Sequence, residues 1–194
     1  MRYFILLIGL LLVAGCAPSP TSSPSVDSTA ITPKFKNNIS TLFGNGGKKV
    51  KDNTGNYIAP NIIWKDSLGV SRSLDSTKGK IIIINFWATW CDPCIAEMPY
   101  LQSISDSLKS EVVVIGVTVD KESPVFDNVE LFVTAKKLTF QIIIDNTAKV
   151  YFNYGAHDFI PWTFVVDRDG YIYHIFEGGI RSRKDLMDVL NQIL

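Results

Sequence analysis

Two cysteines separated by two residues are the clearest candidates for chemistry in this chain of 194 residues. Cys91 and Cys94 lie in the sequence FWATWCDPC, directly after a run of apolar residues. One thiolate can attack a disulfide, and a second thiol nearby can then attack the first and release the partner. The alternatives are a structural disulfide, which would be strained at this spacing, and a zinc site, for which only His157 and His174 could complete four ligands. The spacing therefore favours a redox-active pair.

The residues around the pair predict a strand followed by a helix. Residues 80–87 are a continuous β-branched run, typical of a strand buried on both faces. Residues 91–109 have apolar side chains at helical spacing, and Pro93 suits an opening turn that needs no N–H group. Unpaired N–H groups at a helix N-terminus favour an ionised cysteine, so we expect Cys91 to be the exposed nucleophile and Cys94 the resolving thiol.

Glu97 is the candidate proton acceptor for this chemistry. It lies three residues beyond Cys94, on nearly the same helix face as Met98 and Leu101. A carboxyl group beside an apolar face has a raised pKa, so Glu97 can take the proton of Cys94 when that thiol attacks the mixed disulfide. The alternative is a solvated helix glutamate.

The remaining pattern predicts an α/β fold with a central mixed β-sheet flanked by helices. The expected strands and helices cover residues 111–119, 125–138, 140–144, 163–167, 171–177 and 182–194, preceded by an N-terminal β-hairpin over residues 61–65 and 69–73. We place this domain at residues 57–194. Function in such a fold lies at the carboxyl ends of the parallel strands, where the cysteine pair is found.

The N-terminus predicts targeting and tethering. Arg2 precedes an apolar run too short to span a bilayer, and the ending Val13-Ala14-Gly15-Cys16 resembles the lipobox of bacterial lipoproteins. We expect a signal peptide over residues 1–15 and a lipid on Cys16, with an ordinary secretory signal as the alternative. Residues 16–56 are expected to be a flexible tether because they begin with a Ser, Thr and Pro-rich stretch, although a short helix could dock near Ile39.

Charge and composition exclude several partners and cofactors. The formal net charge is zero and no basic stripe is present, so nucleic-acid binding has no support. No cofactor motif is found, and we expect no metal, which leaves the Cys91–Cys94 disulfide as the redox group. A lipidated Cys16 would place the pair outside the cytoplasm, where disulfides persist.

The sequence resembles the thioredoxin superfamily, and within it the membrane-tethered extracytoplasmic branch that includes TlpA, ResA and the cytochrome c maturation thioredoxins. The resemblance is carried by NFWATWCDPCIAEMP at residues 85–99 and by Ile160-Pro161 followed by TFVVDRDG at residues 163–170. It covers residues 57–194, and residues 121–154 look like the central αβ insertion of that branch. One departure is Trp162, where relatives usually carry a small polar residue.

The resemblance implies both a site and a function. Pro161 would form a cis peptide facing the cysteines, the backbone of Ile160 would receive a substrate strand, and Trp90 and Pro93 would border the same site. The implied activity is that of a thiol-disulfide oxidoreductase that reduces protein disulfides, including cysteines of apocytochrome c. A membrane thiol carrier would supply the electrons. The expected location is extracytoplasmic, on the periplasmic side in a Gram-negative cell.

Three other functions compete with this expectation. Soft thiolates favour Cu(I), so Cys91, Cys94 and His157 could belong to a copper chaperone, although such chaperones of the superfamily usually separate their cysteines by three residues. A peroxidase of the superfamily carries threonine three residues before its cysteine, and Ala88 stands there. A pure adaptor would not need Cys91.

Overall fold

The main sheet is mixed and has its longest strands at the centre. The structure, a computed structural model, describes residues 39–42, 50–51, 55–66, 68–77 and 79–194. Among these residues the main sheet has the strand order β10-β9-β6-β7-β8-β1-β4-β5. Strand β6 pairs in parallel with β7 and antiparallel with β9, while β7, β8 and β1 continue the parallel part. The strands of this sheet are β1 (Ile39–Leu42), β4 (Ile63–Lys65), β5 (Ser71–Ser73), β6 (Ile81–Trp87), β7 (Val112–Thr118), β8 (Gln141–Ile144), β9 (Trp162–Val166) and β10 (Ile172–Glu177).

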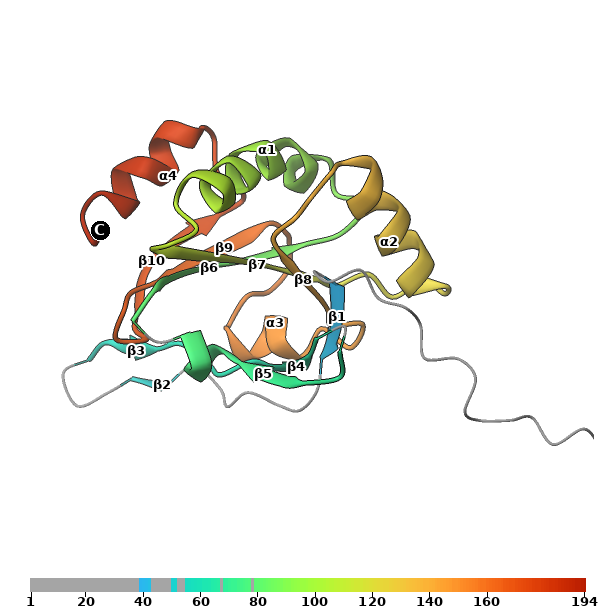
Figure 1. The fold of residues 1–194 in the computed structure, drawn as a ribbon, viewed down its shortest axis with the longest axis horizontal. Coiled ribbons are helices and arrows are strands. Elements are labelled where there is room, and N and C mark those ends of the chain that lie inside the picture. The colour runs from blue at the N-terminus through green and yellow to red at the C-terminus, as the bar shows by residue number, and fades with distance from the viewer. Residues whose placement is uncertain (1–38, 43–49, 52–54, 67, 78) are drawn as a thin grey trace, which may run out of the picture. The chain divides into compact units, whose positions relative to one another are not determined.

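Helices cover both faces of this sheet (Figure 1). Alternate residues of β6 belong to two separate cores, because successive side chains of a strand point to opposite faces. Ile81 and Ile83 pack in one core with buried residues of α1, α2 and α4, whereas Ile82 and Ile84 pack in the other with residues of α3 and β4. The helices are α1 (Asp92–Ser107), α2 (Val125–Ala135), α3 (Lys149–Asn153) and α4 (Arg183–Leu190), with a 3-10 helix η1 (Leu74–Thr77).

The expected architecture is confirmed within the described part of the chain. Every strand and helix predicted after residue 57 is present with ends shifted by a few residues, and β4 and β5 form the expected antiparallel hairpin. Ser182 is the N-cap residue of α4, and its hydroxyl accepts a hydrogen bond from the Asp185 N–H group. Residues 121–154 hold α2, β8 and α3, which accounts for the expected insertion. No helix in the described residues is both long enough and apolar enough to span a bilayer.

The segment before residue 57 differs from the sequence expectation. We assigned residues 16–56 to a tether and considered a short helix near Ile39. Instead, β1 pairs with β8 and β4 in the main sheet, and β2 (Val50–Lys51) pairs with β3 (Tyr57–Ile58) in a separate two-stranded sheet. The hydrogen-bonded structure therefore begins before residue 57, which short strands bordered by glycines do not signal in a sequence.

Gly116 tests the packing at the centre of the sheet. A Cβ atom at this position in β7 would lie 2.9 Å from both Cδ1 of Ile142 and Nε1 of Trp87. We expect Gly116→Ala to lower the free energy of unfolding by about 1–3 kcal/mol because it overpacks the core. Urea denaturation measures this, and Lys109→Ala at the surface should change it by less than about 0.5 kcal/mol. An unchanged stability of Gly116→Ala would contradict the packing.

Candidate active site

The two cysteines form a disulfide at the start of α1. Cys91 is the N-cap residue, and its sulfur accepts a hydrogen bond from the Cys94 N–H group at 3.3 Å. Pro93 lies in the first turn, where its missing N–H group costs no hydrogen bond. The Cys94 N–H group and the helix dipole would stabilise negative charge on the Cys91 sulfur after reduction. The expected exposed nucleophile is more covered than the sequence suggested, since Cys91 is 5% exposed and Cys94 is fully buried.

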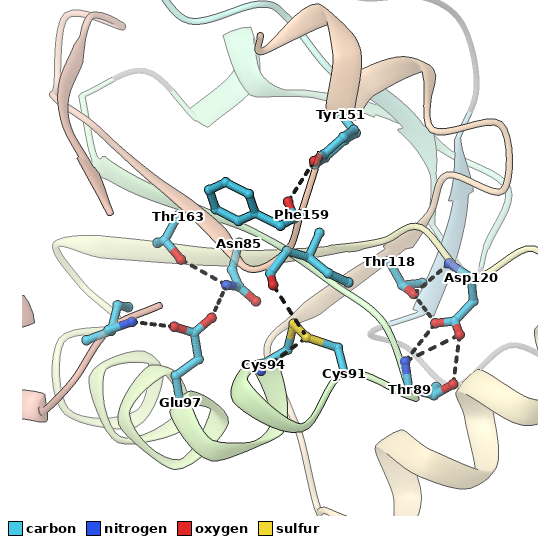
Figure 2. Close-up of a disulfide and its surroundings, with 12 residues drawn as sticks. Asn85, Thr89, Cys91, Cys94, Glu97, Thr118, Asp120, Tyr151, Phe159 and Thr163 are labelled. Carbon is cyan, nitrogen blue, oxygen red and sulfur yellow. Dashed lines mark hydrogen bonds between the residues drawn. A yellow bond between two sulfur atoms is a disulfide. The ribbon is translucent and has the colours of Figure 1, made fainter. Parts of the chain in front are cut away.

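The peptide bond between Ile160 and Pro161 is cis, as the resemblance implied. The Ile160 carbonyl oxygen lies 3.8 Å from the Cys91 sulfur, so the backbone at the entry to β9 faces the disulfide (Figure 2). A groove beside this contact is lined by Trp90, Pro93 and Ile160 among others, and Trp90 is 65% exposed. The residues expected to border a substrate therefore lie together around Cys91.

Glu97 is fully enclosed on the inner side of α1. The residue is 1% exposed, and its carboxylate accepts hydrogen bonds from the Asn85 side-chain amide at 2.6 Å and from the Ile180 N–H group at 2.7 Å. Burial raises the pKa of Glu97 to about 7, although both hydrogen bonds oppose the shift by favouring the charged form. A solvated helix glutamate is therefore ruled out, and a carboxyl group that titrates near neutrality lies one helical turn from Cys94.

Asn85 and Thr163 belong to the same buried network but were not identified from the sequence. The Asn85 amide nitrogen, in β6, also donates to the Thr163 hydroxyl of β9 at 2.9 Å, and both residues are fully buried (Figure 2). The Asn85 amide oxygen is buried without a hydrogen-bond partner among the described residues. The available signal was a polar residue inside an apolar strand, because a buried amide requires partners.

The loop that carries Trp90 and Cys91 is fixed by Asp120, contrary to our expectation. The charged triplet at residues 120–122 predicts a solvated loop from the sequence alone, yet Asp120 is only 6% exposed. Its carboxylate accepts hydrogen bonds from the Thr89 N–H group at 3.0 Å, from the Thr89 hydroxyl at 2.7 Å and from the Thr118 hydroxyl. The end of β7 therefore holds the backbone two residues before Cys91, while Lys121 and Glu122 are exposed as predicted.

His157 gives the copper hypothesis no support. Its Nδ1 atom lies 3.0 Å from the Gly155 carbonyl oxygen, and its ring lies against Trp162 with centroids 5.7 Å apart. Within the described ranges, no group of three His, Cys, Asp or Glu side chains is placed to hold a metal ion. Cys16 and the predicted signal peptide over residues 1–15 lie outside the described residues.

A family model and several curated proteins match this chain. The model described as the AhpC/TSA family matches residues 56–175. Thiol-disulfide oxidoreductase ResA of Geobacillus thermodenitrificans is 34% identical over 136 residues, which is 70% of this chain and 75% of that protein. Thioredoxin-like protein YneN of Bacillus subtilis is 31% identical over 126 residues, or 65% of this chain and 73% of that protein.

Two solved structures illustrate the similarity in fold. StoA from Bacillus subtilis has a TM-score of 0.57 and 29% identity, covering 69% of this chain and 98% of that one. A thiol:disulfide interchange protein of the thioredoxin family from Chlorobium tepidum has a TM-score of 0.60 and 25% identity, covering 70% and 94%. The expected thioredoxin-like fold is confirmed.

The raised pKa of Glu97 predicts how stability depends on pH. Between the ordinary value of 4.5 and about 7, the folded protein keeps a proton that the unfolded chain has lost. The free energy of unfolding should therefore fall as pH rises through this window, by roughly 3 kcal/mol at about 1.4 kcal/mol per pKa unit, and be fully regained below it.

Glu97→Gln removes this titration. Denaturation of the oxidised protein at several pH values should show a flatter profile for Glu97→Gln between pH 4.5 and about 7. The same change at Glu177, which is exposed on β10, should leave the profile as it was. Equal slopes for Glu97→Gln and the unaltered protein would show that the carboxyl group titrates normally.

Proposed function

Because this chain belongs to the AhpC/TSA family and is a thiol-disulfide oxidoreductase of the ResA type, we propose that it reduces disulfides of proteins outside the cytoplasm. The observation that carries the proposal is the Cys91–Cys94 disulfide at the N-terminus of α1, opposite the cis Ile160–Pro161 bond. The backbone of Ile160 can pair with an extended substrate segment and hold its disulfide against Cys91.

The first step is attack by the Cys91 thiolate of the reduced protein on one sulfur of the substrate disulfide. A bond forms between Cys91 and that sulfur, the substrate S–S bond breaks, and the other substrate sulfur leaves as a thiolate. The Cys94 N–H group and the α1 dipole stabilise the attacking charge. The less buried position of Cys91 makes it the attacking sulfur.

The second step resolves the mixed disulfide. Cys94 gives its proton to the ionised Glu97 carboxylate and attacks the Cys91 sulfur, which re-forms the Cys91–Cys94 disulfide and releases the second substrate sulfur as a thiolate. Two electrons have then passed from the protein dithiol to the substrate disulfide. A carboxyl group with a pKa of about 7 can accept this proton and return it near neutral pH.

The protein must be reduced again before another cycle. A membrane thiol carrier is the proposed electron donor, with a lipid on Cys16 holding the domain at the membrane on its extracytoplasmic side. The relatives named ResA support an oxidoreductase, and cysteines of apocytochrome c are one substrate class that we propose. The lipobox-like ending at residues 13–16 supports the anchor.

Trapping the mixed disulfide tests the proposed division of labour. Cys94→Ser should accumulate a covalent adduct through Cys91 when the variant is mixed with an oxidised protein such as insulin, because resolution is blocked. Cys91→Ser should form no such adduct. Non-reducing electrophoresis and mass spectrometry measure the adduct. Trapping by Cys91→Ser instead would reverse the two roles, and no adduct with either variant would contradict the mechanism.

A further inference from the structure

The groove beside the disulfide presents an aromatic wall. It has a volume of about 840 Å³, within the range typical of ligand sites. Phe159, which directly precedes Ile160, is 47% exposed, and Phe152 of α3 is 62% exposed. Large apolar side chains are usually covered in a folded protein, so these rings offer contact area to a bound segment.

Phe159 is held in place from two sides. The Tyr151 hydroxyl donates a hydrogen bond to the Phe159 carbonyl oxygen at 2.7 Å, which fixes the backbone (Figure 2). The Trp162 ring stacks against the Phe159 ring, with centroids 5.5 Å apart and an angle of 27° between the planes. Trp162 is itself 5% exposed and stacks on Phe164 of the core. A contact surface fixed before binding loses little conformational entropy when a partner arrives.

The rim of the groove is predominantly acidic. Asp92, Glu122 and Asp158 line it and are exposed, whereas Lys121 is the lysine among the lining residues. His157 lies 3.8 Å from the Asp158 carboxylate and adds positive charge only when protonated. The surplus of carboxylates complements a basic segment and opposes an acidic one.

We propose that this groove selects substrates: it binds an extended segment of an oxidised protein that carries an apolar residue next to the reacting cysteine and a lysine or arginine close by. Phe159, supported by Trp162, contacts the apolar residue. The acidic rim contacts the basic one. The inference rests on the proposed function, because the segment is taken to be the disulfide substrate of Cys91.

Paired peptides test the selection. Each peptide carries one intramolecular disulfide. The two peptides of the first pair differ only in the residue before the first cysteine, which is Leu in one and Ser in the other. The two peptides of the second pair differ only at a position two residues from that cysteine, which is Lys in one and Glu in the other. The measured quantity is the rate constant for oxidation of the reduced protein, followed by tryptophan fluorescence. The ratio of rate constants within each pair is the readout, so a general loss of activity in a variant cancels.

The unaltered protein should react about tenfold faster with the Leu peptide than with the Ser peptide. Phe159→Ala and Trp162→Thr should both bring this ratio close to one. Trp162→Phe keeps a ring that can stack on Phe159, so its ratio should be close to that of the unaltered protein. Tyr173→Ala removes an exposed aromatic ring of β10 that does not line the groove, and it should leave the ratio and the overall rate unchanged. The preference for Lys over Glu should shrink as salt is added.

Equal rates for the two peptides of each pair in the unaltered protein would overturn the inference. So would an unchanged Leu-to-Ser ratio in Phe159→Ala, which keeps the buried Trp162 and therefore the local fold. The reaction with hydroxyethyl disulfide, a small substrate without a peptide segment, distinguishes a failure of the proposed selection from a failure of the proposed function. If the unaltered reduced protein reacts with it and shows no peptide preference, only the selection fails; if it reacts with no disulfide at all, the proposed function fails as well.

Discussion

The burial of the Glu97 carboxylate is the constraint on which the site depends. A carboxylate enclosed between a helix and a sheet is unstable unless donors reach it, and here one donor comes from β6 and another from the segment before α4. These contacts fix α1 in rotation against the sheet and thereby fix Cys91 and Cys94 at its start. They also leave the carboxyl group with a raised pKa, so one arrangement supplies both geometry and a proton acceptor.

The site is assembled from segments far apart in the sequence because the sheet brings β9 beside β6. Phe86 of β6 pairs with Trp162 of β9, which sets Pro161 and Ile160 against the helix that follows β6. The backbone at Gly179 passes close to both Pro161 and Glu97. A Cβ atom at this position would lie 3.3 Å from Cγ of Pro161 and 3.5 Å from Oε2 of Glu97. The cis proline, the buried acid and the disulfide are therefore held by one continuous set of contacts, and of the two cysteines only Cys91 lines the groove.

Local patterns in the sequence were sufficient for strands β4 to β10, for helices α1, α2 and α4, and for the reactive residues. The β-branched runs gave β6 and β7, the cysteine spacing gave the disulfide, and the position of Glu97 on an apolar helix face gave its burial. The partners of these residues could not be obtained in this way, since Ile180 is 83 residues from Glu97 and Thr163 is 78 residues from Asn85. Asp120 was misjudged because a charged triplet usually indicates solvent, and only the fold shows that Thr89 and Thr118 surround it.

The reduction potential of the Cys91–Cys94 couple decides in which direction electrons flow between the protein and its substrates, and it is the first quantity to measure. It is measured by equilibrating the protein with dithiothreitol buffers and quantifying the free thiols. We expect a value close to that of thioredoxin, about −270 mV, which suits a reductant of protein disulfides. A value near about −120 mV, typical of a strong oxidant such as DsbA, would contradict it and mean that the protein introduces disulfides.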